Sequence, residues 1–149
     1  MKEPIVIDST CLIGLERISQ LDLLPLLFDP VTIPPEVGRE FGNQFSWLRV
    51  QAPSIQSLVA ALKLLVDDGE AEAIALAAEL SYRLVSDDRQ ARIVARQIGL
   101  SLIGTIGILI KAKEAQLVPA INPLIDELEL NGFFLSPALK TEALRLAGE

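Results

Sequence analysis

The sequence predicts an α/β fold, with a central and mainly parallel sheet flanked by helices, in a single domain at residues 1–149. Short apolar or β-branched segments alternate along the chain with longer segments of helical periodicity, as expected when helices join parallel strands. The chain has 149 residues, half of them apolar, which is enough for one sizeable hydrophobic core. No internal repeat, low-complexity segment or linker divides it.

Each element expected in the first half of the chain has a local signal. The first strand is a short apolar run that ends at Asp8, where a helical pattern begins. Pro34 and Pro35 mark the start of a later helix and Gly42 its end, so Glu40 lies in the last turn. The expected elements are strands at 5–7, 31–33 and 47–50, and helices at 9–15, 21–28, 35–41 and 55–66.

The second half continues the alternation. Asp67 and Glu70 match a capping box in front of an Ala-rich helix. Asp87 and Gln90 match another N-cap pattern, which leaves Asp88 as the acid without a structural explanation. The expected elements are helices at 70–80, 89–98, 104–115 and 119–130 and from 137 onward, strands at 83–86 and 100–103, and an edge strand at 133–135.

The composition excludes several kinds of chemistry. The chain has no His, and Cys11 is its only cysteine. Catalysis by a Ser-His-Asp or Cys-His system, His-based zinc binding and an intrachain disulfide are therefore ruled out. Hydrolytic chemistry would have to use carboxylates, hydroxyls, Lys, Arg or Tyr. Clustered carboxylates most naturally hold a hard cation such as Mg²⁺ or Mn²⁺.

Charge and hydropathy limit the partners. The apolar runs fall far short of the roughly 20 residues that a membrane span needs, and no leader is recognisable at the start, so we expect a cytoplasmic protein with no membrane partner. The net charge of −7 argues against broad, non-specific binding of nucleic acid. A local basic patch, or a cation bound among the acids, would change that balance.

Five acids are candidates for one site. Asp8 and Asp88 each follow an expected strand, and right-handed crossovers would bring them to the same edge of the sheet. Glu40 opposes the dipole of its helix, so it has either a functional role or a tolerated place on the surface. At 100° per residue, Glu70 falls on the inner, apolar face of its helix and Glu72 on nearly the opposite face.

A row of basic residues follows the second junction. Arg89, Arg92 and Arg96 lie on one face of the helix expected after Asp88. Guanidinium groups at this spacing are suited to contacting phosphates. The alternative is an ordinary solvated helix face.

Several segments of the sequence, taken in chain order, resemble those of the PIN-domain nucleases. The resemblance is carried by residues 6–10, 33–40, 69–74, 84–92 and 104–109, which together span nearly the whole chain. It implies a three-layer PIN-like fold and hydrolysis of single-stranded RNA with Mg²⁺ or Mn²⁺. Many prokaryotic members of the family are toxins, which implies an antitoxin as a further partner.

The resemblance also implies a set of site residues. The acidic quartet would be Asp8, Glu40, Glu70 and Asp88, as metal ligands and catalytic residues. Glu72 is the alternative to Glu70, and Asp87 is the alternative to Asp88. The resemblance also implies supporting roles for Ser9 and Thr10, and it makes Arg89 and Arg92 candidates for holding the substrate backbone.

Two functions therefore stand against each other. One is a metal-dependent endoribonuclease, in one version the toxin of a toxin-antitoxin pair. The other is a catalytically weak or inactive PIN-like module that binds RNA or a protein partner. A phosphoacceptor domain is disfavoured, because it needs an early pair of acids and a later Lys at a strand end. The apolar residues 133–135 and the apolar tail are compatible with a homodimer.

Overall fold

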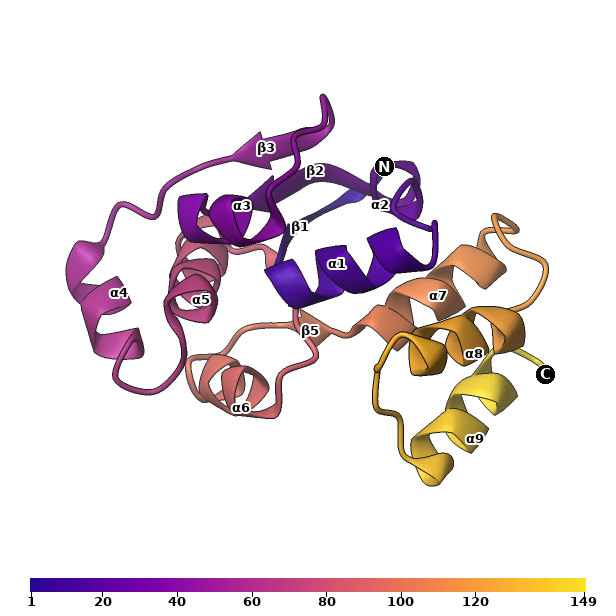
Figure 1. Cartoon of the computed structure of the whole chain (residues 1–149). Helices are drawn as coiled ribbons and strands as arrows, with labels where there is room; N and C mark the ends of the chain where they lie inside the picture. The colour runs from indigo at the N-terminus through magenta and orange to yellow at the C-terminus, as the bar shows by residue number, and fades with distance from the viewer.

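The computed structural model describes residues 1–149 and contains a five-stranded sheet in the order β3-β2-β1-β4-β5 (Figure 1). Every neighbouring pair of strands is parallel, which confirms the predicted α/β class. All five expected strands with helical connections are present; the first two are longer than the sequence suggested and the other three are shorter. The second strand begins at Phe28, which the sequence had placed at the end of the helix expected at 21–28. The strands are β1 (Glu3–Ile7), β2 (Phe28–Ile33), β3 (Leu48–Val50), β4 (Arg83–Val85) and β5 (Leu102–Ile103).

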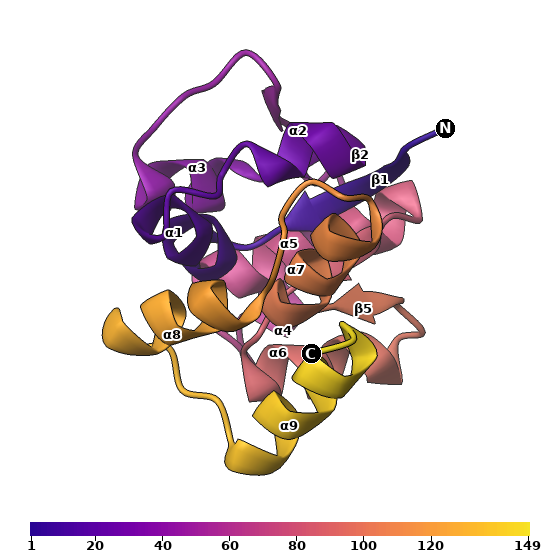
Figure 2. The ribbon, with the colours of Figure 1, turned by 90° about the vertical axis from the view of Figure 1, so that its right-hand side faces the viewer.

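Nine helices flank this sheet in a three-layer arrangement (Figures 1 and 2). On one face α1, α2 and α7 pack together, and α9 packs on α7; on the other, α5 packs on β1, β4 and α6. The short α3 contacts both α1 and α5. The helices are α1 (Ser9–Arg17), α2 (Leu23–Leu27), α3 (Pro35–Phe41), α4 (Gln56–Leu62), α5 (Asp68–Leu80), α6 (Arg89–Gln97), α7 (Thr105–Glu114), α8 (Asn122–Leu130) and α9 (Pro137–Leu146).

The core lies between the sheet and its two helical layers. It is one cluster of 41 buried hydrophobic residues, and Ile5, Val6 and Ile7 of β1 are fully buried in it. Because helices cover both faces of this central strand, β1 has no polar side and reads as a continuous apolar run. No helix in the structure has the length and apolar character needed to cross a membrane.

The expected edge strand at 133–135 is wrong. These residues form a loop between α8 and α9 and pair with no strand. The backbone N–H of Phe133 donates to the Leu128 carbonyl at 2.9 Å and so helps to end α8. Gly132 adopts φ +89° and turns the chain away from the helix axis. The apolar segment therefore forms no strand, and its first N–H closes α8 instead.

Glu149 caps the N-terminus of α8, a helix that has no capping side chain of its own. The carboxylate of Glu149 accepts hydrogen bonds from the backbone N–H groups of Ile121 and Asn122 at 2.8 and 3.1 Å. It also pairs with the Lys113 ammonium at 3.0 Å. The hydrogen bond from Ile121 is the main reason why the pKa of Glu149 lies below its ordinary value. The C-terminal helix is thereby tied to α7 and α8.

We predict that Glu149→Gln lowers the melting temperature at pH 7 by about 1–3 °C. Because the folded-state pKa is depressed, this stabilisation is present above the ordinary value of 4.5 and is lost as the pH falls through the folded value. Thermal melts of both proteins from pH 7 to pH 3 should therefore converge at the acidic end. Equal melting temperatures at pH 7 would contradict the capping role.

Candidate active site

The candidate site lies where the connections of the sheet change direction. From β1 the chain passes to β2 on one side, whereas from β4 it passes to β5 on the other. Ile7 pairs with Val85, and the N–H of Asp8 donates to the Val85 carbonyl at 3.1 Å. Asp8 therefore lies beside Ser86, at the carboxyl edge next to the switch point, where ligands bind in open α/β sheets.

Asp8 is both a helix cap and a buried acid. Its Oδ1 accepts the backbone N–H of Cys11 at 2.9 Å, which makes Asp8 the N-cap of α1. Only 4 % of the residue is exposed. Burial raises the pKa of Asp8 to about 6, and the charge of Asp87 adds to the rise, while hydrogen bonds from Cys11 and Ser86 oppose it. A charge held this far from water favours a cation nearby.

The structure exchanges the expected roles of Asp87 and Asp88. Asp88 is the N-cap of α6, since its Oδ2 accepts the N–H of Ala91 at 2.8 Å, and its side chain is exposed. Asp87 instead accepts both the N–H and the hydroxyl of Thr105, at 3.0 and 2.6 Å. The prediction that Asp87 caps this helix is therefore wrong. The D-x-x-Q pattern could not show it, because the partner of Asp87 lies 18 residues further along the chain.

Two further residues complete the surroundings of Asp87. The thiol of Cys11 donates to its Oδ2 at 3.2 Å, so Cys11 contacts both Asp8 and Asp87. A Cβ at Gly104 would lie 2.6 Å from Oδ1, which explains the Gly in front of Thr105. Burial is the main reason why the pKa of the Cys11 thiol is well above its ordinary value, so the thiol keeps its proton for this hydrogen bond.

Glu70 faces the acidic residues at the end of β4, whereas Glu72 does not. Glu70 forms the predicted capping box with Asp67, and Glu70 and Asp88 line the same cavity. Burial raises the pKa of Glu70 to about 8, with further contributions from Asp88 and Asp67. Glu72 accepts the N–H of Glu36 at 3.2 Å and thereby joins α5 to α3.

Glu40 reaches the same region from α3. Its carboxylate lies against Gly69, where any Cβ would overlap Oε1. Partial burial raises the pKa of Glu40, helped by the charges of Asp67 and Glu36, and a hydrogen bond from Ser9 opposes the rise. Glu40 is unfavourably placed in the last turn of α3, but its carboxylate lies at the N-terminal end of α5, where the helix dipole favours a negative charge.

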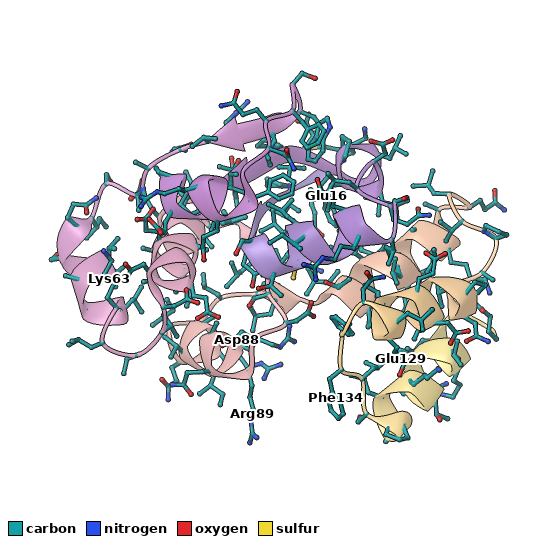
Figure 3. The ribbon with its side chains drawn as sticks, in the orientation of Figure 1. Glu16, Lys63, Asp88, Arg89, Glu129 and Phe134 are labelled. Atoms are coloured by element: carbon teal, nitrogen blue, oxygen red, sulfur yellow. The ribbon has the colours of Figure 1, made fainter.

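A cavity of about 670 Å³ opens next to these carboxylates. Thr10, Glu70, Asp87, Asp88 and Arg92 line one end of it. Arg92 is partly engaged, because its Nη1 donates to the Ser86 carbonyl at 2.6 Å. Figure 3 shows Asp88 at the start of α6 and Arg89 pointing away from the ribbon into solvent.

The acids are brought to one edge but not around one point. Glu70 and Asp88 line one cavity, the charge of Asp87 contributes to the raised pKa of Asp8, and Asp8 and Glu70 line one small hollow. No group of three or more acidic or cysteine side chains is arranged to hold a metal ion. Sequence reasoning missed the contributions of Ser86 and Thr105 and the part played by Cys11. The Gly104-Thr105 dipeptide was the one available signal.

The fold and the site together define a class of protein: an α/β domain with carboxylates from several elements at the switch point of its sheet. A family model described as a PIN domain matches residues 4–149, and the chain belongs to the PIN-domain family. This confirms the resemblance noted from the sequence. PIN domains are generally nucleases, and PIN nucleases generally use divalent metals. Among curated proteins, none matches the chain.

Gly69→Ala tests the placement of Glu40. The new methyl group would displace a flexible carboxylate rather than backbone, and Ala favours a helix over Gly. We therefore predict an unchanged or higher melting temperature together with weaker Mn²⁺ binding, measured by differential scanning calorimetry and isothermal titration.

Gly38→Ala is the matched control for this change. It adds the same methyl group to another helix, where the nearest atom, Ile33 Cδ1, lies at an ordinary 3.6 Å. Equal metal affinity in both variants would show that Glu40 takes no part in the site.

Proposed function

We propose that this protein is a Mg²⁺- or Mn²⁺-dependent endoribonuclease that hydrolyses phosphodiester bonds of single-stranded RNA. The observation that carries the proposal is that acids from the β1–α1 junction, α3, α5 and the β4–α6 junction all lie at one edge of the sheet, at its switch point. Membership of the PIN-domain family supports nuclease chemistry and the binding of nucleic acid.

The residues present fit a hard divalent cation in their chemistry. All candidate donors are carboxylate oxygens, as Mg²⁺ and Mn²⁺ prefer, and no His competes for a softer metal. Burial is the main cause of the raised pKa values of Asp8 and Glu70, and a cation beside these carboxyl groups would favour their charged form. The residues that would hold the cation are Asp8, Glu40, Glu70 and Asp88, with Asp87 as a further donor beside Asp8. When bound, the cation supplies Lewis acidity and lowers the pKa of a water molecule.

The remaining side chains position this acidic set. Thr105 and Cys11 fix the Asp87 carboxylate, and Ser9 does the same for Glu40. Thr10 is exposed at the edge of the cavity, where its hydroxyl can orient water or a phosphate oxygen. Arg89, free of any ion pair, is the residue we assign to the RNA backbone. Arg92 lines the cavity but also holds the Ser86 carbonyl, which makes its role partly structural.

A non-catalytic PIN-like module that binds RNA or a protein is the second candidate. One observation favours it: Asp8, Glu70 and Asp88 each make a helix-capping hydrogen bond, so their presence has a structural explanation. Charge-specific substitutions separate the two functions. A role as a toxin, an antitoxin partner, a homodimer and a cytoplasmic location all stay predictions.

Asp8→Asn and Asp88→Asn test the proposed activity. Asn caps helices about as well as Asp, so both variants should fold, while the loss of one anionic ligand should slow cleavage by about a hundredfold or more. The measurement is cleavage of a fluorescent single-stranded RNA with Mn²⁺, alongside thermal melts.

Asp22→Asn supplies the control. Asp22 precedes α2, and its side chain makes no capping hydrogen bond, so this variant should cleave at the wild-type rate. RNA cleavage that persists in both Asp8→Asn and Asp88→Asn would refute the nuclease assignment to these acids.

A further inference from the structure

The cavity beside the acids has a second, apolar end. Asp67, Glu70, Asp87 and Asp88 lie on one side, and the other side is made by α7, α9 and the loop that joins α8 to α9. Glu142 of α9 is the one carboxylate on that other side, and it pairs with Arg145. Ile106, Ile110, Phe133, Phe134, Leu139 and Leu146 line this apolar side. Because Asp88 and these apolar side chains line one cavity, an RNA strand whose phosphate lies at Asp88 can place a neighbouring nucleoside against them.

Phe134 is exposed between two neighbours that are more deeply buried. Residues 133–135 lie in the loop between α8 and α9 and belong to no helix or strand. Phe133 is half-buried and Leu135 is 6 % exposed, whereas Phe134 between them is 86 % exposed. Figure 3 shows Phe134 on the α8–α9 loop, at the side that faces α6. The loop thus presents a whole aromatic ring to the cavity and anchors it on both sides.

We propose that Phe134 is a stacking platform for an unpaired nucleobase next to the phosphate at the acidic end of the cavity. This inference rests on the proposed function and adds a base-binding subsite to it. Arg92 is the one basic side chain that lines the cavity, and the carboxylates repel phosphates unless a cation is bound, so contacts with the bases add affinity that the acidic end does not supply. Stacking on an aromatic ring supplies neutral binding energy, tolerates every base and requires that the base be unpaired. The subsite therefore selects single strands without reading a sequence.

The binding experiment uses a fluorescein-labelled oligouridine with Ca²⁺ in place of Mg²⁺ to slow cleavage. We expect Phe134→Ala to weaken binding by about five- to a hundredfold, as loss of one base stack does, and Phe134→Trp to retain it. Leu130→Ala is the matched control, because Leu130 is 87 % exposed in the same region and does not line the cavity. This control should bind like wild type.

Removal of single bases from the strand identifies the stack itself. At one abasic position the affinity of the wild type should fall by the same factor as the Phe134→Ala substitution causes. With that abasic strand, wild type and Phe134→Ala should bind equally well. Equal binding by wild type and Phe134→Ala, no binding by wild type, or an equal loss at every abasic position would overturn the subsite. Binding of a basic amphipathic peptide that depends on Phe134, without binding of the strand, would assign the cavity to a protein partner instead.

The outcomes for the subsite and for the nuclease are separable. If Asp8→Asn and Asp88→Asn cleave like wild type, the nuclease assignment fails. The base-binding subsite is then still tested independently, by comparing RNA binding of wild type and Phe134→Ala. If wild type cleaves and Phe134→Ala both binds and cleaves equally well, the subsite fails and the nuclease assignment remains.

Discussion

The parallel pairing of β1 with β4 is the constraint on which the acidic edge depends. It sets Ile7 opposite Val85, so that Asp8 emerges beside Ser86 and one residue ahead of Asp87. A slip of one residue would turn these side chains to the opposite faces of the sheet. The register is fixed in turn by burial, because both strands are covered by helices and their apolar residues are fully enclosed. The same packing that stabilises the domain therefore determines which carboxylates meet.

The acids at this edge combine two physical roles. Asp8 and Asp88 satisfy orphan N–H groups at the starts of α1 and α6, and Glu70 does so for Asp67 in front of α5. Helix N-termini carry partial positive charge, which offsets part of the repulsion between clustered carboxylates before any cation binds. A PIN-like domain can thus assemble an acidic site without losing its fold. This is why amide substitutions, which preserve the caps, separate chemistry from stability better than alanine substitutions do.

Local signals predicted the fold well and the site less completely. The helix stop at Gly42 and the capping box at Asp67 depend on neighbours within four residues, and both are present. The partner of Asp87 is Thr105, from the other side of a strand crossover, so a local capping pattern misassigned the acid. Residues 133–135 failed as a strand for the same kind of reason, since their first N–H closes α8. The approach of Glu40 to Gly69 likewise depends on tertiary packing alone.

Calorimetric titration of Mg²⁺ and Mn²⁺ into EDTA-treated protein tests the central claim most directly, with wild type compared to the double variant Asp8→Asn/Asp88→Asn. If acids from separate elements form one cation site, wild type should bind saturably and the double variant should not, while both keep the same fold by circular dichroism. Equal binding by the two proteins would contradict the shared site and leave these carboxylates as helix caps.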